Sequence, residues 1–437
     1  MSVPAAWVAL EFLRSHLLSG FGWNLLGYSQ TPWPALIQIA DVTGVWGVSW
    51  LIVLVNVAIA GVLRAGKPSS RMAPLLIAAG CLIAAGLYGV VKLAQPLYGM
   101  PPPAPWNEGR AGVRVAVVQG NIPQEQKWDE AYRDAILERY DQLTHQAAAQ
   151  QPDLIVWPEA SVPGLLVDDE ALTARIRRLT HDAGSPVLLG APLSRLHQGV
   201  SRYTNSAVIL GPDGSISARY DKLHLVPFGE FVPFESLAPW LREVLPPIGD
   251  FVPGHEYTVF ETRDPSQTSD IRHQTSDQRP ETRDQRKRVT SSLQSPVSSL
   301  ASPFSVLICF EDIFPELARR FVQRGAQWLV TITNDAWFGN TAAPYQHAQA
   351  STFRAVELRV PMVRAANTGW SGCIDSRGRW VTSVRDPRGE ELFVEGVAVC
   401  EVTVGDTPTM YRRWGDWFAW LCILGCLGGM FFAIMKR

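Results

Sequence analysis

Cys309 is the residue whose place in the sequence most directly indicates chemistry. It ends the apolar run Ser305–Cys309, which predicts a buried strand. The carboxylates of Glu311 and Asp312 follow almost at once, and a helical pattern begins at Pro315. A cysteine at a strand end is placed to act as a nucleophile at the edge of a sheet. Taken alone, it is also consistent with a buried structural cysteine, because free cysteine is among the most buried residue types.

Glu159 is a second candidate, because it follows the apolar run Leu154–Val156 and stands beside Trp157 and Pro158. These neighbours are expected to desolvate its carboxyl group in part. Desolvation raises the pKa of a carboxyl group towards the range that suits a general base. The alternative is a loop carboxylate that caps a turn.

Lys222 and Glu230 belong to a third stretch, Arg219–Pro233, which is dense in Pro, Gly and aromatic residues and predicts a rigid, irregular loop. Lys222 could supply a fixed cation that stabilises an oxyanion and favours the thiolate of a nearby cysteine. Glu230 could hold that lysine or share the work of the base. A lysine in a loop is otherwise simply solvated.

The elements that must position these residues alternate between short apolar runs and polar, helix-like stretches, which predicts an α/β layered domain. The candidate strands are Val113–Val118, Leu154–Val156, Val187–Leu189, Ser206–Leu210, Ser305–Cys309, Trp328–Thr333, Met362–Ala365 and Val397–Val402. The candidate helices are Asp129–Ala148, Asp169–Asp182, Glu316–Arg324 and Pro344–Arg359.

Both ends of the 437-residue chain are apolar, and hydrophobic residues make up 47% of the whole. Three stretches are long and apolar enough to span a membrane: Val42–Leu63, Ala73–Val91 and Trp417–Met435. We therefore expect a transmembrane region over residues 1–93, a catalytic domain over 112–404 and a transmembrane helix over 415–437. The first residues lack the charged segment and cleavage site of a signal peptide.

Basic residues at the ends of the spans predict the orientation in the membrane. Arg64, Lys67 and Arg71 lie between the first two spans without any acidic residue, and the last span ends in Lys436 and Arg437. The positive-inside rule places both groups in the cytoplasm. The domain between the spans is then expected on the outer face, although two arginines just before the last span oppose this weakly.

Residues 262–303 do not fit the layered domain. The segment is nearly devoid of aliphatic residues, and the motif Gln-Thr-Ser-Asp occurs in it twice, at 267–270 and 274–277. Such polar repetition cannot bury enough apolar surface to order a chain, so it predicts a disordered insertion. A neutral insertion and a regulatory segment are both compatible with it.

Composition excludes several classes of function. The formal charge of −2 provides no basic field for a nucleic acid. The six cysteines show no closely spaced framework, so we do not expect a disulfide scaffold. The chain also lacks the usual metal and phosphate-loop motifs, which predicts no metal site.

Three motifs carry a resemblance to the nitrilase superfamily: Trp157-Pro-Glu159, Asp221-Lys-Leu-His-Leu-Val-Pro-Phe-Gly-Glu230 and Cys309-Phe-Glu311. Together with the membrane spans, they make the chain similar to the membrane-bound branch, the apolipoprotein N-acyltransferases of the bacterial inner membrane. The resemblance covers nearly the whole chain apart from the insertion. It implies an αββα sandwich domain inserted between transmembrane helices.

The resemblance also implies roles for individual residues. The expected triad is Glu159, Lys222 and Cys309, oriented by Glu230 and Glu311, and the expected substrate contacts are Trp128, Asn205 and Trp337. For the two tryptophans, anchoring at the membrane interface is the alternative. The implied reaction moves an acyl chain from a phospholipid, through an S-acyl cysteine, to the α-amino group of a diacylated apolipoprotein, with no metal or soluble cofactor.

The sequence departs from the family's pattern at two points, and two other functions are open. Phe310 stands where the family usually has tyrosine, and the front of the chain is expected to be several membrane helices shorter. The first alternative is a membrane-tethered amidase that uses water as acceptor. The second is an inactive, truncated paralogue that acts as a binding module.

Overall fold

The structure is a computed structural model that describes residues 2–64, 69–95, 112–197, 200–233, 240, 251–260, 302–405 and 407–436. The predicted insertion 262–303 lies outside these residues up to position 301. Its last two residues belong to the folded domain, because Ser302 is buried and its carbonyl accepts a hydrogen bond from the Trp328 indole.

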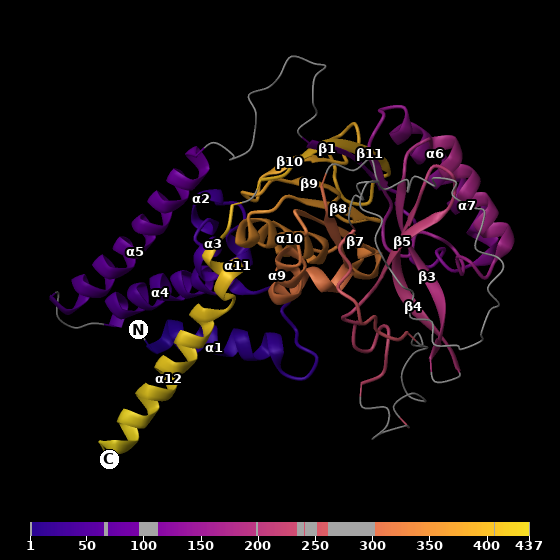
Figure 1. Cartoon of the computed structure of the whole chain (residues 1–437). Helices are drawn as coiled ribbons and strands as arrows, with labels where there is room; N and C mark the ends of the chain where they lie inside the picture. The colour runs from indigo at the N-terminus through magenta and orange to yellow at the C-terminus, as the bar shows by residue number, and fades with distance from the viewer. Residues whose placement is uncertain are drawn as a thin grey trace, which may run out of the picture.

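The first sheet has six strands in the order β11-β1-β2-β3-β4-β5. Strands β1, β2 and β3 are parallel, whereas β4, β5 and β11 pair with their neighbours antiparallel. The strands are β1 (Gly112–Gln119), β2 (Leu154–Val156), β3 (Val187–His197), β4 (Val200–Leu210), β5 (Ile216–Asp221) and β11 (Gly396–Thr403). Helices α6 (Arg133–Ala148) and α7 (Glu170–Ala183) cover its outer face (Figure 1).

The second sheet has five strands in the order β10-β9-β8-β7-β6, of which β6, β7 and β8 are parallel. The strands are β6 (Phe304–Ile308), β7 (Trp328–Thr333), β8 (Met362–Ala366), β9 (Gly372–Ile374) and β10 (Trp380–Ser383). Its helices are α9 (Pro315–Gln323) and α10 (Ala343–Leu358). The described part of the sandwich domain also contains the short 3₁₀-helices η2 (Glu130–Tyr132), η4 (Cys309–Ile313) and η5 (Asp335–Phe338).

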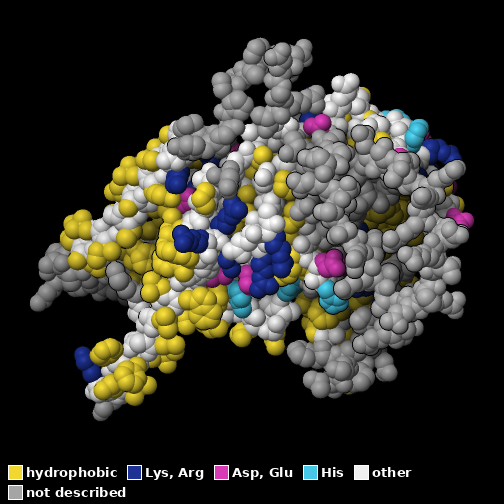
Figure 2. Space-filling model, viewed as in Figure 1, with side chains coloured by type: hydrophobic (Ala, Val, Ile, Leu, Met, Phe, Trp, Pro, Cys, Tyr) yellow, Lys and Arg dark blue, Asp and Glu magenta, His cyan; other side chains and the backbone are white. Residues whose placement is uncertain are grey.

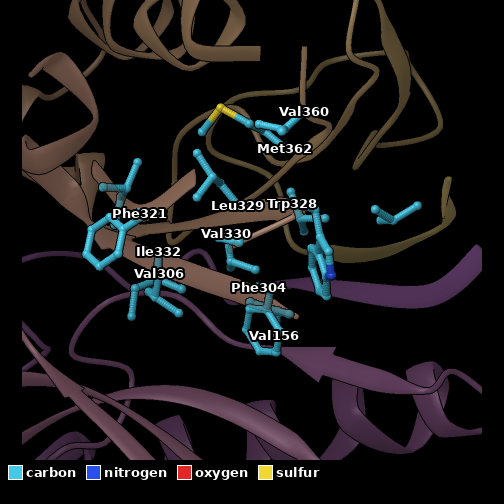
Figure 3. Packing of buried hydrophobic residues seen from close by; sticks show 14 of the residues in the cluster. Val156, Phe304, Val306, Phe321, Trp328, Leu329, Val330, Ile332, Val360 and Met362 are labelled. Atoms are coloured by element: carbon cyan, nitrogen blue, oxygen red, sulfur yellow. The ribbon is translucent and has the colours of Figure 1, made fainter. Parts of the chain in front are cut away.

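The two sheets pack face to face around an apolar core. Along β1, Val113, Val115 and Val117 face the second sheet, whereas Ala116 and Val118 face α6 and α7, as the two-residue period of a strand requires. In Figure 3, side chains of β6 and β7 meet Val156 from the opposite sheet. This arrangement confirms the predicted αββα sandwich.

The membrane helices lie to one side of the sandwich (Figure 1). In the part of the chain that the structure describes, three helices are long and apolar enough to cross a membrane, within Val45–Leu63, Met72–Ala94 and Trp417–Met435. The helical elements here are α1 (Ser2–His16), η1 (Leu26–Gln30), α2 (Pro34–Ile37), α3 (Ala40–Thr43), α4 (Val45–Arg64), α5 (Ser69–Ala94), α11 (Met410–Trp414) and α12 (Trp417–Met435). Figure 2 shows hydrophobic side chains gathered over α5 and α12, which a lipid environment would cover.

Buried contacts join the membrane helices to the sandwich. Phe310 and Ile313 of η4 belong to one apolar cluster with Phe12 of α1 and Trp46 of α4. The Arg359 guanidinium, just after α10, binds the buried Asp41 carboxylate of α3 at 2.8 Å. The turn that carries Cys309 therefore rests directly on the membrane part.

Strands β2 and β7 and helix α12 match their predicted ranges, and the other predicted elements occur with shifted ends. Strands β5, β9 and β10 were not predicted. Strand β5 is only partly buried and carries no apolar run, and β9 has only three residues. Their strand conformation comes from pairing with neighbours and not from local hydrophobic pattern.

A disulfide joins Cys373 of β9 to Cys400 of β11 and so links the two sheets. The expectation that the cysteines form no disulfide framework missed this pair. The two residues are 27 positions apart and meet only because the sandwich stacks their strands. The spacing of the cysteines along the sequence therefore did not indicate this disulfide.

We expect replacement of both cysteines, Cys373→Ser with Cys400→Ser, to lower the unfolding free energy by about 3 kcal/mol, because the closed loop restricts the unfolded chain. The measurement is the unfolding temperature in detergent, with and without a reductant. The reductant should lower this temperature in the wild-type protein and leave the double variant unchanged. An equal effect of reductant on both proteins would contradict the prediction.

Candidate active site

Cys309 lies at the carboxyl end of β6, in the first position of η4. Its φ angle is +54°, in the left-handed region, which costs a non-glycine residue about 1–3 kcal/mol. The surrounding structure must therefore hold the turn in place. Cys309 keeps some exposure, although the residues on both sides of it are buried.

Glu311 ties this turn to the loop after β5. One carboxylate oxygen accepts from the Ile308 N–H at 2.7 Å, and the other accepts from the Tyr220 hydroxyl and the Leu223 N–H, both at 2.7 Å. Burial raises the pKa of Glu311 to about 7, although these donors favour the charged form. These contacts hold the turn to the loop after β5, and the orienting role of Glu311 stays a prediction.

Lys222 directly follows β5 and is 1% exposed. Its Nζ lies 3.0 Å from the Glu230 carboxylate and 3.4 Å from Oε1 of Glu159. Asn205 of β4 donates to both carboxylates, at 2.8 Å to Glu159 and 2.7 Å to Glu230. One ammonium group and one amide thus hold the two acids together in the interior.

Glu159 follows β2, and its carboxylate faces the nucleophile turn. Its Oε2 accepts from the backbone N–H of Asn334, after β7, at 2.9 Å. The charge of the same carboxylate raises the pKa of the Cys309 thiol, as expected for neighbouring groups. The structure therefore brings Glu159, Lys222 and Cys309 together from three strand ends that are far apart in the sequence.

The pKa of Glu159 lies below its ordinary value, opposite to the direction that we expected. Burial alone would raise it, as Trp157 and Pro158 suggested. The cations of Lys222 and Lys127 and the Asn205 hydrogen bond outweigh that effect. Glu159 is therefore a carboxylate at neutral pH, and the expectation of a raised pKa was wrong.

The pKa of the Cys309 thiol is raised well above its ordinary value by desolvation and by the Glu159 charge, and Lys222 opposes the rise. The resting site thus holds a thiol beside a carboxylate and not a thiolate. Proton transfer from sulfur to Glu159 is unfavourable before substrate binds. It must accompany the attack of sulfur on an electrophile.

Lys127 is a residue of the site that we did not predict. It is 4% exposed, and its Nζ donates to the Glu159 carbonyl at 2.9 Å. Burial lowers its pKa to about 8, although Glu159 and Cys309 oppose the shift. No local pattern distinguishes it from a surface lysine, because its burial depends on strands elsewhere in the chain.

Trp128 and Trp337 are 51% and 69% exposed and flank the site. The side-chain oxygen of Asn334, when turned towards them, accepts from Lys127 Nζ at 3.2 Å and from the Trp337 indole at 3.3 Å. Substrate contact by the tryptophans stays a prediction. Asn205, the third expected substrate contact, donates to the two carboxylates, and its contact with substrate also stays a prediction. Among the described residues, no cluster of three or more His, Cys, Asp or Glu could hold a metal ion.

Comparison with known proteins first identifies the class of protein to which the sandwich domain belongs. The carbon-nitrogen hydrolase family matches residues 114–405, the whole of the sandwich. A solved structure of the amidase from Nesterenkonia sp. AN1 is 18% identical and covers 71% of this chain and 96% of that protein, with a TM-score of 0.44.

The N-terminal membrane part shows which branch of this class the chain resembles. The apolipoprotein N-acyltransferase N-terminal domain matches residues 1–58. The apolipoprotein N-acyltransferase of Geobacter metallireducens is 38% identical over 97% of this chain and 72% of its own length. That of Methylococcus capsulatus is 34% identical over 99% and 74%. The chain belongs to the apolipoprotein N-acyltransferase family, which confirms the resemblance seen in the sequence.

We expect Lys222→Met to slow alkylation of Cys309 by iodoacetamide at pH 8 roughly tenfold or more, because loss of the cation raises the thiol pKa further. The measurement is the mass of the peptide that contains Cys309, so that other cysteines do not interfere. The control is Arg388→Met, which removes an exposed cation. Alkylation of folded Lys222→Met at the wild-type rate would contradict this electrostatic account.

Proposed function

We propose that the protein moves a fatty acyl chain from a membrane phospholipid to the α-amino group of the diacylglyceryl-cysteine of an apolipoprotein. Its family establishes it as an acyltransferase of the membrane. The observation that carries the proposal is the meeting of Glu159, Lys222 and Cys309 in a domain packed against membrane helices. A lipid-anchored donor and acceptor can reach such a site by diffusion in the membrane.

In the first half-reaction, the Cys309 sulfur attacks the ester carbonyl of the phospholipid while the Glu159 carboxylate takes the thiol proton. Lys222 and a backbone N–H near Phe310 stabilise the oxyanion. The ester C–O bond then breaks, and Glu159 returns the proton to the leaving oxygen. A lysophospholipid departs, and a thioester remains on Cys309.

In the second half-reaction, the neutral α-amino group of the apolipoprotein attacks the thioester. Glu159 takes a proton from the nitrogen and delivers it to the departing sulfur. The products are an amide on the lipoprotein and the free thiol of Cys309. Because Glu159 begins each half-reaction as a carboxylate, its lowered pKa suits both.

Two of the remaining predicted site residues act through these three groups. Glu230 shares the Lys222 cation, and Glu311 holds the turn that presents the sulfur. Trp128 and Trp337 provide exposed aromatic surface for the substrates at the edge of the site.

We place the catalytic domain on the periplasmic face of the bacterial inner membrane. The basic residues between the first two spans and at the end of the last one support this orientation. The disulfide between Cys373 and Cys400 supports it independently, because disulfides persist in oxidising compartments.

The test is transfer of a labelled acyl chain from phospholipid to a diacylated lipopeptide in liposomes. Cys309→Ala should abolish transfer, because no thioester can form. Glu159→Gln and Lys222→Met should each lower the rate by about 10³-fold or more, as expected for groups that act as a unit.

The matched controls are Cys426→Ala and the exposed Glu138→Gln, which should transfer at the wild-type rate. Transfer by Cys309→Ala would refute the assignment of the nucleophile. Release of ammonia from soluble amides without transfer to the lipopeptide would instead identify a membrane-tethered amidase. Absence of both activities from folded wild-type protein would identify a binding module.

A further inference from the structure

His347 of α10 lies beneath the nucleophile turn and has no part in the reaction above. It is 1% exposed. Its Nδ1 lies 2.8 Å from the Asp335 carboxylate, and its Nε2 lies 2.9 Å from Asp312 and 3.3 Å from the carbonyl oxygen of Cys309. The imidazole therefore contacts the backbone of the nucleophile itself.

Arg364 of β8 completes a closed cluster with the same carboxylates. Its guanidinium binds Asp312 at 2.7 Å and Asp335 at 3.0 Å, and all four side chains are fully buried. Two carboxylates and one guanidinium leave a net negative charge in the interior. Only the imidazolium form of His347 cancels it, and an uncancelled buried charge is costly.

The positions of Asp312 and Asp335 in the sequence show which turns the cluster holds. Asp312 belongs to η4, which begins at Cys309, and Asp335 belongs to η5, which follows Asn334. The cluster thus fixes two turns at once: the one that carries the thiol and the one whose backbone N–H binds Glu159. The left-handed conformation of Cys309 needs such support, because it is not locally favoured.

The membrane part contacts this cluster from the other side. The Trp23 ring, in the loop after α1, lies 5.0 Å from the His347 ring, and its indole donates to Gln346. Arg354 of α10 donates both to the carbonyl of Asp312 and to the hydroxyl of Tyr28. His347 therefore lies where the membrane segment meets the nucleophile turn.

We propose that His347 is a positioning residue, whose imidazolium holds the Cys309 carbonyl and Asp312 so that the thiol stays aligned with Glu159. This inference rests on the proposed function, in which Cys309 carries the acyl group. It assigns His347 no contact with substrate.

The proposal predicts a pH dependence. The groups that face His347 are Asp312 and the Cys309 carbonyl from η4, Asp335 from η5, Arg364 through the two carboxylates, and the uncharged rings of Trp23 and Phe338. Burial lowers the pKa of His347, but Asp312 and Asp335 outweigh this effect and raise it to about 9. The His347 imidazolium therefore supports the nucleophile turn below about pH 9, and this support is lost as the pH rises through that value.

The test is the single-turnover rate of Cys309 acylation by phospholipid in wild-type protein, His347→Gln and His347→Ala. The alanine variant should acylate roughly 10²-fold more slowly with an unchanged KM for phospholipid, because a misplaced nucleophile loses rate and not binding. Glutamine can still donate to the Cys309 carbonyl, so its variant should retain more activity. The ratio of wild-type to glutamine-variant rates should fall as the pH rises through about 9, and this ratio cancels the titration of the thiol.

The control is His181→Gln, which replaces an exposed histidine and should change nothing. Acylation of His347→Ala at the wild-type rate, or a rate ratio for the glutamine variant that is constant from pH 7 to 10, would overturn the proposal. If the alanine variant does not fold, the pH profile of the glutamine variant decides. Acylation that persists in Cys309→Ala would instead refute the proposed function.

Discussion

One buried ammonium group, shared by two carboxylates, is the constraint on which the site depends. Lys222 is almost wholly buried between Glu159 and Glu230. Without it, two negative charges would face each other in the interior, and the pKa of Glu159 would rise. The same cation opposes the rise in the pKa of the Cys309 thiol. A single charge thus acts on the pKa of both the base and the nucleophile.

The position of the site follows from the way in which the sandwich is joined to the membrane part. The turn at Cys309 shares an apolar cluster with α1 and α4, and ion pairs such as Arg359 with Asp41 lock the domain to the membrane segment. A sandwich attached by a flexible linker alone could tilt its site away from the lipid. The contacts here give the thiol one fixed relation to the membrane helices, which suits substrates that are themselves anchored in lipid.

Much of this was predictable from the sequence, because the informative features are local. Apolar runs ended by polar residues located β2, β6 and β7, and uninterrupted apolar stretches located α4, α5 and α12. Glu159 and Cys309 were recognisable because each stands at the end of an apolar run. Lys222 was recognisable because it lies in a loop rich in Pro, Gly and aromatic residues. The local pattern did not predict structure that depends on partner strands. Strand β5 carries no apolar run, and Cys373 meets Cys400 only because the two sheets stack. The direction of the Glu159 pKa shift was predicted wrongly for the same reason, since Lys222 and Lys127 become its neighbours only in the folded chain. The cluster around His347 combines residues of α10, β8 and two turns, and no spacing predicts it.

The most direct test of the account is the intact mass of purified protein after incubation with phospholipid in the absence of any acceptor. The account predicts one added acyl chain, bound as a thioester to Cys309 and removed by hydroxylamine. Folded protein that gains no acyl mass, or that carries the chain on another residue, would contradict it.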